Sequence, residues 1–489
     1  MNRFLLVVCF LFISATTFGQ QFSQYNTGTL FDSFENPAQT NFIPDSSRYV
    51  SFNFFVPNFG TNLFVKGNGQ VALKSRTFVG RYVNNNLTIG KNNFSRVNAD
   101  ANTYFLMLRI FNNLDGDQEM GFSIQTRGEG TGLFSDETLL LSSRPSAFKS
   151  VTTAGDPLIY KDVLNNSYRY QAYHQISFAY REKFSKKFSF GFKLSALLGI
   201  QYQRLNINQS TLQVDDILNA ATLGLQGDYR ISYTPGKFTG HDLLPSFRNP
   251  GASISVGTRL QTRDNFIIQA NLKDLGFIHW GGKSTESHFN NLANPDSVLD
   301  LYGSKLEDRL YATTRNIVHS RDIEKGFTTP TNAKFELSAN KSYWLDNEMR
   351  YRYSPTLIVQ KELFYDDYTI ALSNPFQYKN FTGTIVTSYN NYKIFTAGLQ
   401  FMVKNPNTEF FIGSDRLLQS VSFAGAAAGS VNQIQKTGAY SGADFFMGFS
   451  LKFGHVIEHP LNSSIIPLGE RPGLIKRLWN SIWGIDNGD

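Results

Sequence analysis

The sequence is almost free of cysteine: the only one, Cys9, lies near the start of the chain. The first 19 residues have the pattern of a secretory signal peptide, with a positive start, an apolar run from Phe4 to Ala15 and small residues at the end. Cleavage before Gln20 would leave a mature chain without cysteine. That excludes disulfides, thiol nucleophiles and cysteine-ligated metals.

Charge and long apolar runs are also scarce. Charged residues make up only 17% of the chain, and the net charge of +7 is spread without a basic block, so we expect no nucleic-acid partner. Beyond the leader no run of about 18 apolar residues occurs, which excludes membrane-spanning helices. Aromatic residues are abundant instead, with 44 Phe and 23 Tyr. This composition is typical of an outer-membrane β-barrel.

The clearest pattern lies in Lys187–Arg204, where even-numbered residues are apolar and odd-numbered residues are small, hydroxylated or cationic. Only Leu197 breaks the alternation, which places the two kinds of side chain on opposite faces of a strand. The alternative is a long amphipathic strand of a soluble sandwich. Soluble strands usually end after about 5 or 6 residues, whereas a membrane strand needs about 9 to 11, so the length favours the membrane.

Similar alternation recurs along the chain and predicts the fold class. Tyr168–Tyr180 would form a hairpin with the strand just described, and the last strand would end at Phe453. We therefore predict an all-β, single-chain transmembrane antiparallel barrel of about 14 strands over residues 48–453. Three connecting pieces have helical spacing: Leu133–Leu141, Val214–Leu223 and Pro295–Tyr311.

Residues 20–47, before the first strand, are polar and rich in turn-forming residues. A segment of this kind is either a disordered leader or a plug folded inside the barrel. Within it, Asn36-Pro37-Ala38 is either a functional plug motif or only a turn, because Asn-Pro commonly starts one.

Four stretches carry a resemblance to a known family: Glu35–Ala38, Asn249–Gly251, Asn271–Trp280 and Gly413–Leu418. On these the chain resembles Bacteroidota outer-membrane barrels grouped as a domain of unknown function. They are distant relatives of the FadL fatty-acid transporter and of the PorV and PorQ barrels of type IX secretion. The resemblance implies a FadL-like barrel with its N-terminal segment inside, and no known ligand.

We expect the remaining motif residues to be structural: Asp274, Leu275, Gly276, Trp280, Gly413, Ser414 and Asp415. Asp274-Leu275-Gly276 would be a strand end and a glycine bend, followed by Trp280 as an aromatic anchor at the membrane interface.

No residues point to catalysis, a metal or a cofactor. The seven histidines are scattered; His455 and His459 flank the end of the last strand, where surface histidines are a simpler interpretation than a metal site. The neighbouring carboxylates Asp215-Asp216 and Asp366-Asp367 would face apart on strands and could not share a proton. We expect a protein that is not an enzyme.

The tail, residues 454–489, contains a predicted amphipathic helix over 472–483. Its apolar face would consist of Ile475, Leu478, Trp479, Ile482 and Trp483. That face could pack on the periplasmic rim of the barrel, lie in the inner-leaflet interface, or dock a periplasmic partner.

Two functions follow from the sequence. The first is a conduit in the outer membrane for a hydrophobic or small solute. The alternative is a non-transporting accessory subunit of an outer-membrane secretion or assembly complex. The expected partners are outer-membrane lipid and, for the second function, periplasmic or outer-membrane proteins.

Overall fold

The computed structural model describes residues 22–39, 48–83, 86–111, 117–151, 157–185, 187–233, 238–365 and 367–456, and also Gly473, Arg477 and Asn480. The predicted signal peptide, residues 1–19, lies outside the described residues, as do Ile475, Leu478, Trp479, Ile482 and Trp483 of the predicted tail helix. Within the described part of the chain, none of the helices is long and apolar enough to cross a membrane.

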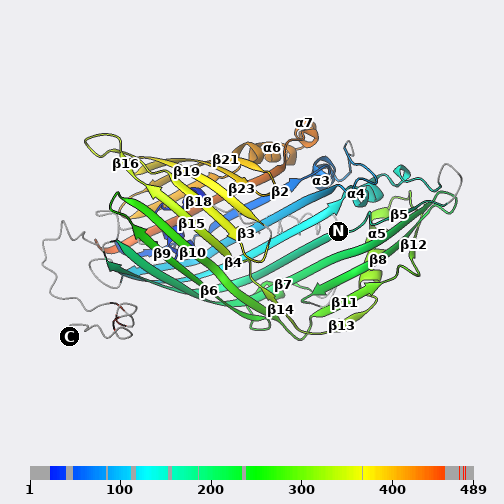
Figure 1. Cartoon of the computed structure of the whole chain (residues 1–489), viewed down its shortest axis with the longest axis horizontal. Coiled ribbons are helices and arrows are strands. Elements are labelled where there is room, and N and C mark those ends of the chain that lie inside the picture. The colour runs from blue at the N-terminus through cyan, green and yellow to red at the C-terminus, as the bar shows by residue number, and fades with distance from the viewer. Residues whose placement is uncertain are drawn as a thin grey trace.

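The strands form a closed antiparallel β-barrel of 14 strands, which confirms the predicted fold class (Figure 1). In order they are β1 (Arg48–Phe52) continued by β2 (Asn58–Lys66), β3 (Phe94–Phe111), β4 (Gln118–Ser135), β6 (Ser167–Ser185), β7 (Phe188–Asp215), β9 (Pro250–Gln261), β10 (Phe266–Trp280), β15 (Lys334–Lys341), β18 (Thr356–Glu362), β19 (Tyr368–Tyr378), β20 (Phe381–Asn390), β21 (Phe395–Lys404), β22 (Thr408–Ser414) and β23 (Ser441–Val456). The last strand, β23, pairs with β1 and β2 as well as with β22, so the sheet has no edge.

Side chains alternate across the wall as a membrane barrel requires. On β20 and β21, Ile385, Leu399 and Phe401 are exposed, whereas Thr384 and Gln400 are buried inside. The exposed apolar face suits lipid, and closure pairs the backbone all round, which a bilayer demands. The protein is therefore a transmembrane barrel of the outer-membrane kind.

The two rims of the barrel differ. At one rim the connections are short turns, such as Thr262–Asn265, Lys379–Asn380 and Asn405–Asn407, with one small hairpin, β16 (Tyr343–Trp344) and β17 (Tyr351–Tyr353). The first wall strand also begins there and the last one ends there. Short turns are typical of the periplasmic side of such barrels, so we assign this rim to the periplasm.

The opposite, outer rim carries most of the helices and a lobe of additional strands (Figure 1). The helices are α3 (Gln70–Val79), α4 (Asp136–Ser143), α5 (Leu306–Val318), α6 (Leu417–Ala427) and α7 (Val431–Gln435), and the additional strands are β5 (Ile159–Lys161), β8 (Ala220–Ile231), β11 (Thr285–Asn290), β12 (Asp296–Leu299), β13 (Asp322–Glu324) and β14 (Phe327–Pro330). Arg76 of α3 pairs with Glu307 of α5. Burial, together with the Glu307 carboxylate, raises the pKa of the neighbouring Tyr82 to about 12.

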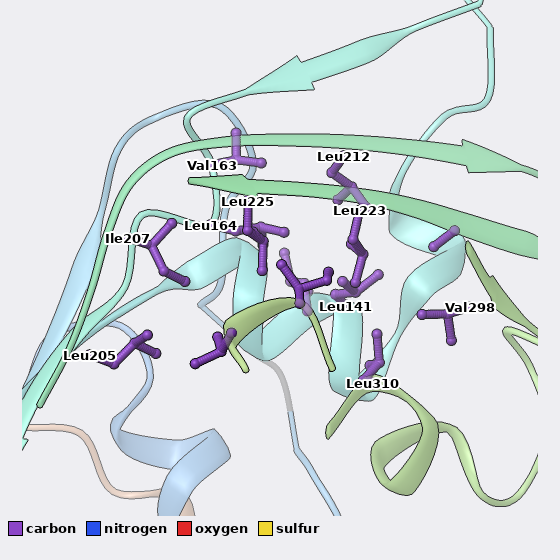
Figure 2. Packing of buried hydrophobic residues seen from close by; sticks show 14 of the residues in the cluster. Leu141, Val163, Leu164, Leu205, Ile207, Leu212, Leu223, Leu225, Val298 and Leu310 are labelled. Atoms are coloured by element: carbon purple, nitrogen blue, oxygen red, sulfur yellow. The ribbon is translucent and has the colours of Figure 1, made fainter. Parts of the chain in front are cut away.

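The lobe has a hydrophobic core of its own (Figure 2). Strand β7 is 28 residues long, far more than the roughly 9 to 11 needed to cross a bilayer, and its outer half pairs with β8. Leu212, Leu223 and Leu225 of these strands are almost fully buried and belong to one cluster with Leu141 of α4 and Leu310 of α5. The outer lobe, defined here as β5, β8, β11–β13, α4, α5 and the outer half of β7, is thus held together like a small soluble domain.

Of the three helices predicted in the connections, one is wrong and two are displaced. Val214–Leu223 is the end of β7, a turn and the start of β8. Pro295–Tyr311 begins as β12, and its helix, α5, starts only at Leu306. In Leu133–Leu141 the helix begins at Asp136, because Ser135 accepts a hydrogen bond from the Thr138 amide and caps it. In Val214–Leu223 a turn between two strands brought apolar residues to helical spacing.

The predicted interface anchor is also wrong. Trp280 is completely buried and packs against Tyr202, with ring centroids 5.7 Å apart. The pairing of β7 with β9 ends at Leu198 and Pro250. Trp280 packs against the next residue of β7, Gly199, where β9 no longer covers that strand. Its indole N–H donates to the Thr329 hydroxyl at 2.8 Å, so it needs no water.

Candidate functional site

The N-terminal segment lies inside the barrel, in the position predicted for a luminal plug. We define the plug as residues 22–39, which contain the short helices η1 (Phe22–Gln24) and α2 (Leu30–Glu35). Almost all of its residues are buried. Helix α2 begins after Thr29, whose hydroxyl accepts a hydrogen bond from the Asp32 amide at 3.2 Å. A helix this short is unstable alone, so the wall must hold it.

One face of α2 packs on aromatic side chains of the wall. Phe31 meets Tyr104 edge to face at 5.6 Å and Phe411 at 5.8 Å. Phe34 is buried and lies over Gly121, where an added β-carbon would come within 2.9 Å of its ring. This apolar contact fixes the helix on one side of the lumen, and polar contacts fix the rest.

Two carboxylates of the wall hold the first part of the plug. Asp415 accepts hydrogen bonds from the Phe22 amide at 2.8 Å and from the Ser23 hydroxyl at 3.0 Å. Glu409 accepts from the Leu30 amide at 2.8 Å, at the N-terminus of α2, where a negative charge is favoured. Glu409 is itself paired with Lys452 at 2.6 Å. The motif residue Asp415 is therefore a plug contact as well as part of the wall.

Glu35, the last residue of α2, points at cations of the wall. Its carboxylate lies 3.1 Å from Arg127 and 3.7 Å from Lys273, and it accepts the Tyr104 hydroxyl at 2.7 Å. Lys273 also pairs with Glu336 of the wall at 2.9 Å. A buried charge network of this kind is costly to break, because each lost partner leaves an uncompensated charge.

Asp274 stands at the centre of this network, and the prediction of a strand end there is wrong. Strand β10 continues through it, with a β-bulge between Leu272 and Leu275. Asp274 adopts a positive φ of 49°, which turns its side chain into the lumen beside that of Lys273. There it pairs with Arg127 and, at 3.4 Å, with Lys193. The Asp274 amide is satisfied by the Ser255 hydroxyl at 2.8 Å.

The Asn36-Pro37-Ala38 turn lies against two glycines of the wall. Gly191 of β7 and Gly257 of β9 are paired across the strands. A β-carbon on Gly191 would lie 2.6 Å from the carbonyl carbon of Pro37, and one on Gly257 would lie 2.9 Å from the amide nitrogen of Ala38. Only glycine leaves room for the plug backbone at these positions.

Hydrogen bonds complete this contact. The Asn36 side chain donates to Gln269 at 2.6 Å and accepts the Ala38 amide at 3.2 Å, which closes the turn. The Ser189 hydroxyl donates to the Ala38 carbonyl at 3.2 Å. The sequence left open whether this motif is a plug contact or a turn; the structure shows a turn whose residues all contact the wall.

Buried cations bind the backbone carbonyls of the plug. Arg181 donates to the carbonyls of Ser33 and Gln39, and its charge is balanced by Glu119 at 2.8 Å. Lys193 donates to the carbonyl of Phe34 at 3.3 Å. Backbone carbonyls at the end of a helix attract cations, so these contacts support α2 from its C-terminal side.

The plug leaves little free space at its centre. A cavity of about 70 Å³ lies between the plug and the wall, lined among others by Glu35, Arg127, Glu129, Lys273 and Asp274. A cavity that holds benzene is about 150 Å³. At this level the lumen therefore admits water and not a solute of even that size while the plug is in place.

The other motif residues have structural positions. Leu275 is 37% exposed on the lipid face of β10, opposite in direction to Asp274. Gly276 and Gly413 allow close packing, since an added β-carbon would lie 2.5 Å from Ser253 and from the Phe446 ring respectively. The Ser414 hydroxyl lies 3.1 Å from that of Ser420 in α6.

Sequence reasoning missed Arg127, Arg181 and Lys273 as plug contacts. Their sequence signal was weak, because the neighbours on the same face of each strand are mixed: Gln125 and Glu129 flank Arg127, whereas Ala179 and Lys183 flank Arg181. Among the described residues no three side chains of the metal-binding types converge. His288 and His319 pair with Asp228 and Asp322, at 2.5 and 2.8 Å, on the outer lobe and away from the plug.

The wall and the plug together define a class of protein: a 14-stranded transmembrane barrel closed by its own N-terminal segment. The chain belongs to the family of unknown function DUF5723, whose model matches residues 42–415. No curated protein matches the sequence.

Several solved outer-membrane structures are similar in outline. The toluene transporter TodX of Pseudomonas putida is 10% identical with a TM-score of 0.40, over 86% of this chain and 93% of its own. The monoaromatic hydrocarbon channel CymD is 10% identical with a TM-score of 0.32, over 88% and 94%. The translocator domain of the autotransporter NalP from Neisseria meningitidis is 8% identical with a TM-score of 0.32, over 85% and 91%. The fold assignment rests on the strand pairing of this chain and not on these scores.

Proposed function

We propose that the protein is a non-enzymatic conduit of the outer membrane that its own plug keeps closed. One observation carries the proposal: at the level of the charge network the lumen is filled by the N-terminal segment, which the wall holds by hydrogen bonds, ion pairs and aromatic contacts. Removal of residues 22–39 from such a barrel would leave a passage lined by the strands. A segment with short helices and many polar contacts is suited to move.

The lining of the lumen favours small polar solutes. Its buried wall positions carry hydroxyl, amide and charged groups, for example Gln125, Gln175, Ser195, Asn271 and Gln400. A hydrocarbon would find apolar contacts only where Phe22, Phe31 and Phe34 of the plug now pack, whereas a polar solute could exchange its water for the polar groups elsewhere. Of the two kinds of solute that the sequence suggested, hydrophobic or small, the second fits this lining better.

The test compares the intact barrel with a variant lacking residues 22–39, each reconstituted in planar bilayers and in liposomes. We expect low conductance for the intact protein and a large, steady conductance for the deletion variant. Liposome swelling with sugars of increasing size would then give the width of the passage. Equal conductance of the two proteins would contradict the proposal.

The accessory-subunit function remains a second proposal because apolar side chains protrude from the outer lobe. At the β7–β8 turn Ile217 is 95% exposed and Leu218 is 69% exposed, outside the membrane. Exposed apolar side chains at such a site can mark a protein contact. A variant with both residues changed to Ser, purified from native membranes beside the wild type, would distinguish the two functions. Loss of a co-purifying protein, with unchanged conductance, would support the accessory role.

A further inference from the structure

A second cavity, of about 320 Å³, lies nearer the periplasmic rim, and Tyr25 of the plug lines both this cavity and the first one. Tyr25, Asn26 and Thr27 of the plug form one wall. The opposite wall comes from β17, from the β19–β20 turn and from the end of β21. Its volume is at the lower end of the range of about 300 to 1,000 Å³ that is usual for small-molecule sites.

The charge of this cavity is of one sign. Arg352, Lys379 and Lys404 line it, and the lining contains no carboxylate. Lys404 donates to the plug carbonyls of Thr27 and Gly28, at 3.0 and 2.8 Å, and these carry no net charge. Among the described residues none of the three cations has an ion-pair partner. By contrast, Arg127 and Lys452 elsewhere in the lumen are each paired with a carboxylate.

Two hydrogen-bond donors in the same lining have no acceptor. The Nε of Arg352 and the side-chain nitrogen of Asn26 are buried and make no hydrogen bond within the described part of the chain. A buried donor without an acceptor is destabilising, so each of these two groups requires an explanation, and a bound molecule with acceptor oxygens would provide one. The two donors come from opposite walls of the cavity, one from the barrel and one from the plug.

We propose that this cavity binds phosphate, either free or as the phosphate group of a small organic phosphate. Three cations in a lining that contains no carboxylate match a dianion better than a monocarboxylate, and the planar guanidinium of Arg352 suits phosphate oxygens. Pro375, Met402 and Pro406 complete the lining and leave room for a small organic body. Phosphate binding is independent of the proposed conduction, because it is measured whether or not the solute passes.

The test is isothermal titration of the purified full-length barrel in detergent with inorganic phosphate, glycerol 3-phosphate and acetate. We expect both phosphates to bind and acetate to bind at least about tenfold more weakly. Arg352→Gln and Lys379→Gln should each weaken phosphate binding by about tenfold or more, the usual effect of losing a charge-assisted hydrogen bond. Tighter binding of glycerol 3-phosphate than of phosphate would identify an organic phosphate as the ligand.

Arg350 provides a matched control. It lies next to the same β16–β17 hairpin but pairs with Asp346 and Glu348, at 3.3 and 2.9 Å, and does not line the cavity. Arg350→Gln should leave the affinity unchanged. Absence of phosphate binding to the wild type, equal affinity in all three variants, or stronger binding of acetate would each overturn the proposal. Lys379 lies in an exposed turn, so its variant stays informative if Arg352→Gln fails to fold.

Discussion

A substitution at Gly191 should release the plug without unfolding the barrel. A β-carbon there would lie 2.6 Å from the carbonyl carbon of Pro37, whereas nonbonded carbons prefer about 3.5 to 4.0 Å. In Gly191→Val the plug must therefore move by about 1 Å or more. The wall strand is held by its ladder on both sides, so the plug is the part that moves.

The energetic cost follows from the hydrogen bonds that this movement breaks. A shift of that size stretches the hydrogen bond from Ser189 to Ala38, now 3.2 Å, beyond the usual limit, and misaligns that from Asn36 to Gln269. Two hydrogen bonds of about 1 kcal/mol each amount to about 2 kcal/mol. The undocked fraction of the plug should then rise roughly 30-fold.

Single-channel recording in planar bilayers measures the undocked fraction directly. We expect the Gly191→Val channel to open more often and for longer than the wild-type channel. Gly383→Val is the matched control, because a β-carbon at Gly383 would meet nothing within 4 Å. Both variants should keep the shift between boiled and unboiled protein on a detergent gel, which reports a closed barrel. If the two variants conduct alike, the close approach of Pro37 to Gly191 does not hold the plug in place, and the expected release is refuted.

Three further predictions concern the wall and the lobe. Asp274→Asn leaves Arg127 and Lys193 without their shared carboxylate and should lower the free energy of unfolding by roughly 3–5 kcal/mol in a urea titration. Asp346→Asn, at the exposed rim, is the control, and a comparable loss of stability there would show that burial is irrelevant. The Leu194 side chain is 48% exposed on the lipid face, so Leu194→Arg should lower the free energy of unfolding by roughly 2–4 kcal/mol and Leu194→Ala by much less. Equal effects of the two substitutions would place Leu194 outside the bilayer. Leu223→Ala, in the core of the outer lobe, should lower the stability of the lobe by about 2–5 kcal/mol and leave the barrel closed. New protease cleavage in the lobe, with an intact barrel on a detergent gel, would show this. Unfolding of the whole protein would instead show that lobe and barrel are one unit.

The barrel could be predicted from sequence because lipid imposes a simple rule on it. Every wall strand must present apolar side chains outward, and on β7 the two-residue alternation is visible from Phe188 to Ala196. The rule fails where a bulge adds a residue. The alternation predicts Tyr202 on the apolar face, but Gly199 and Gln201 pair with adjacent residues of β6, so the intervening residue reverses the alternation and Tyr202 lies buried.

The site was harder to predict for the same reason. The bulge at Asp274 has no sequence signature, since the positive φ is adopted by an ordinary aspartate between strand residues. The outer lobe was missed because its turns bring apolar residues to helical spacing. The plug, in contrast, was one of two alternatives for the polar segment without periodicity that precedes the strands, and a segment this polar can be buried only against a polar wall.

The contacts of the plug also restrict the order of events during biogenesis. Phe22 binds Asp415, 393 positions later in the chain, and Asn36 binds Gln269, 233 positions later. Asp415 follows β22, and its amide is bonded to Asp444 of the last strand, so the surface that receives the first residues is complete only when the final strand is in place. Phe22 and Ser23 therefore find their partner only when the barrel closes, whereas Arg127 of β4 and Arg181 of β6 are available to the plug earlier. The strands that pair first can hold α2 while the rest of the wall assembles, so the closing of the barrel and the final docking of the plug are coupled steps.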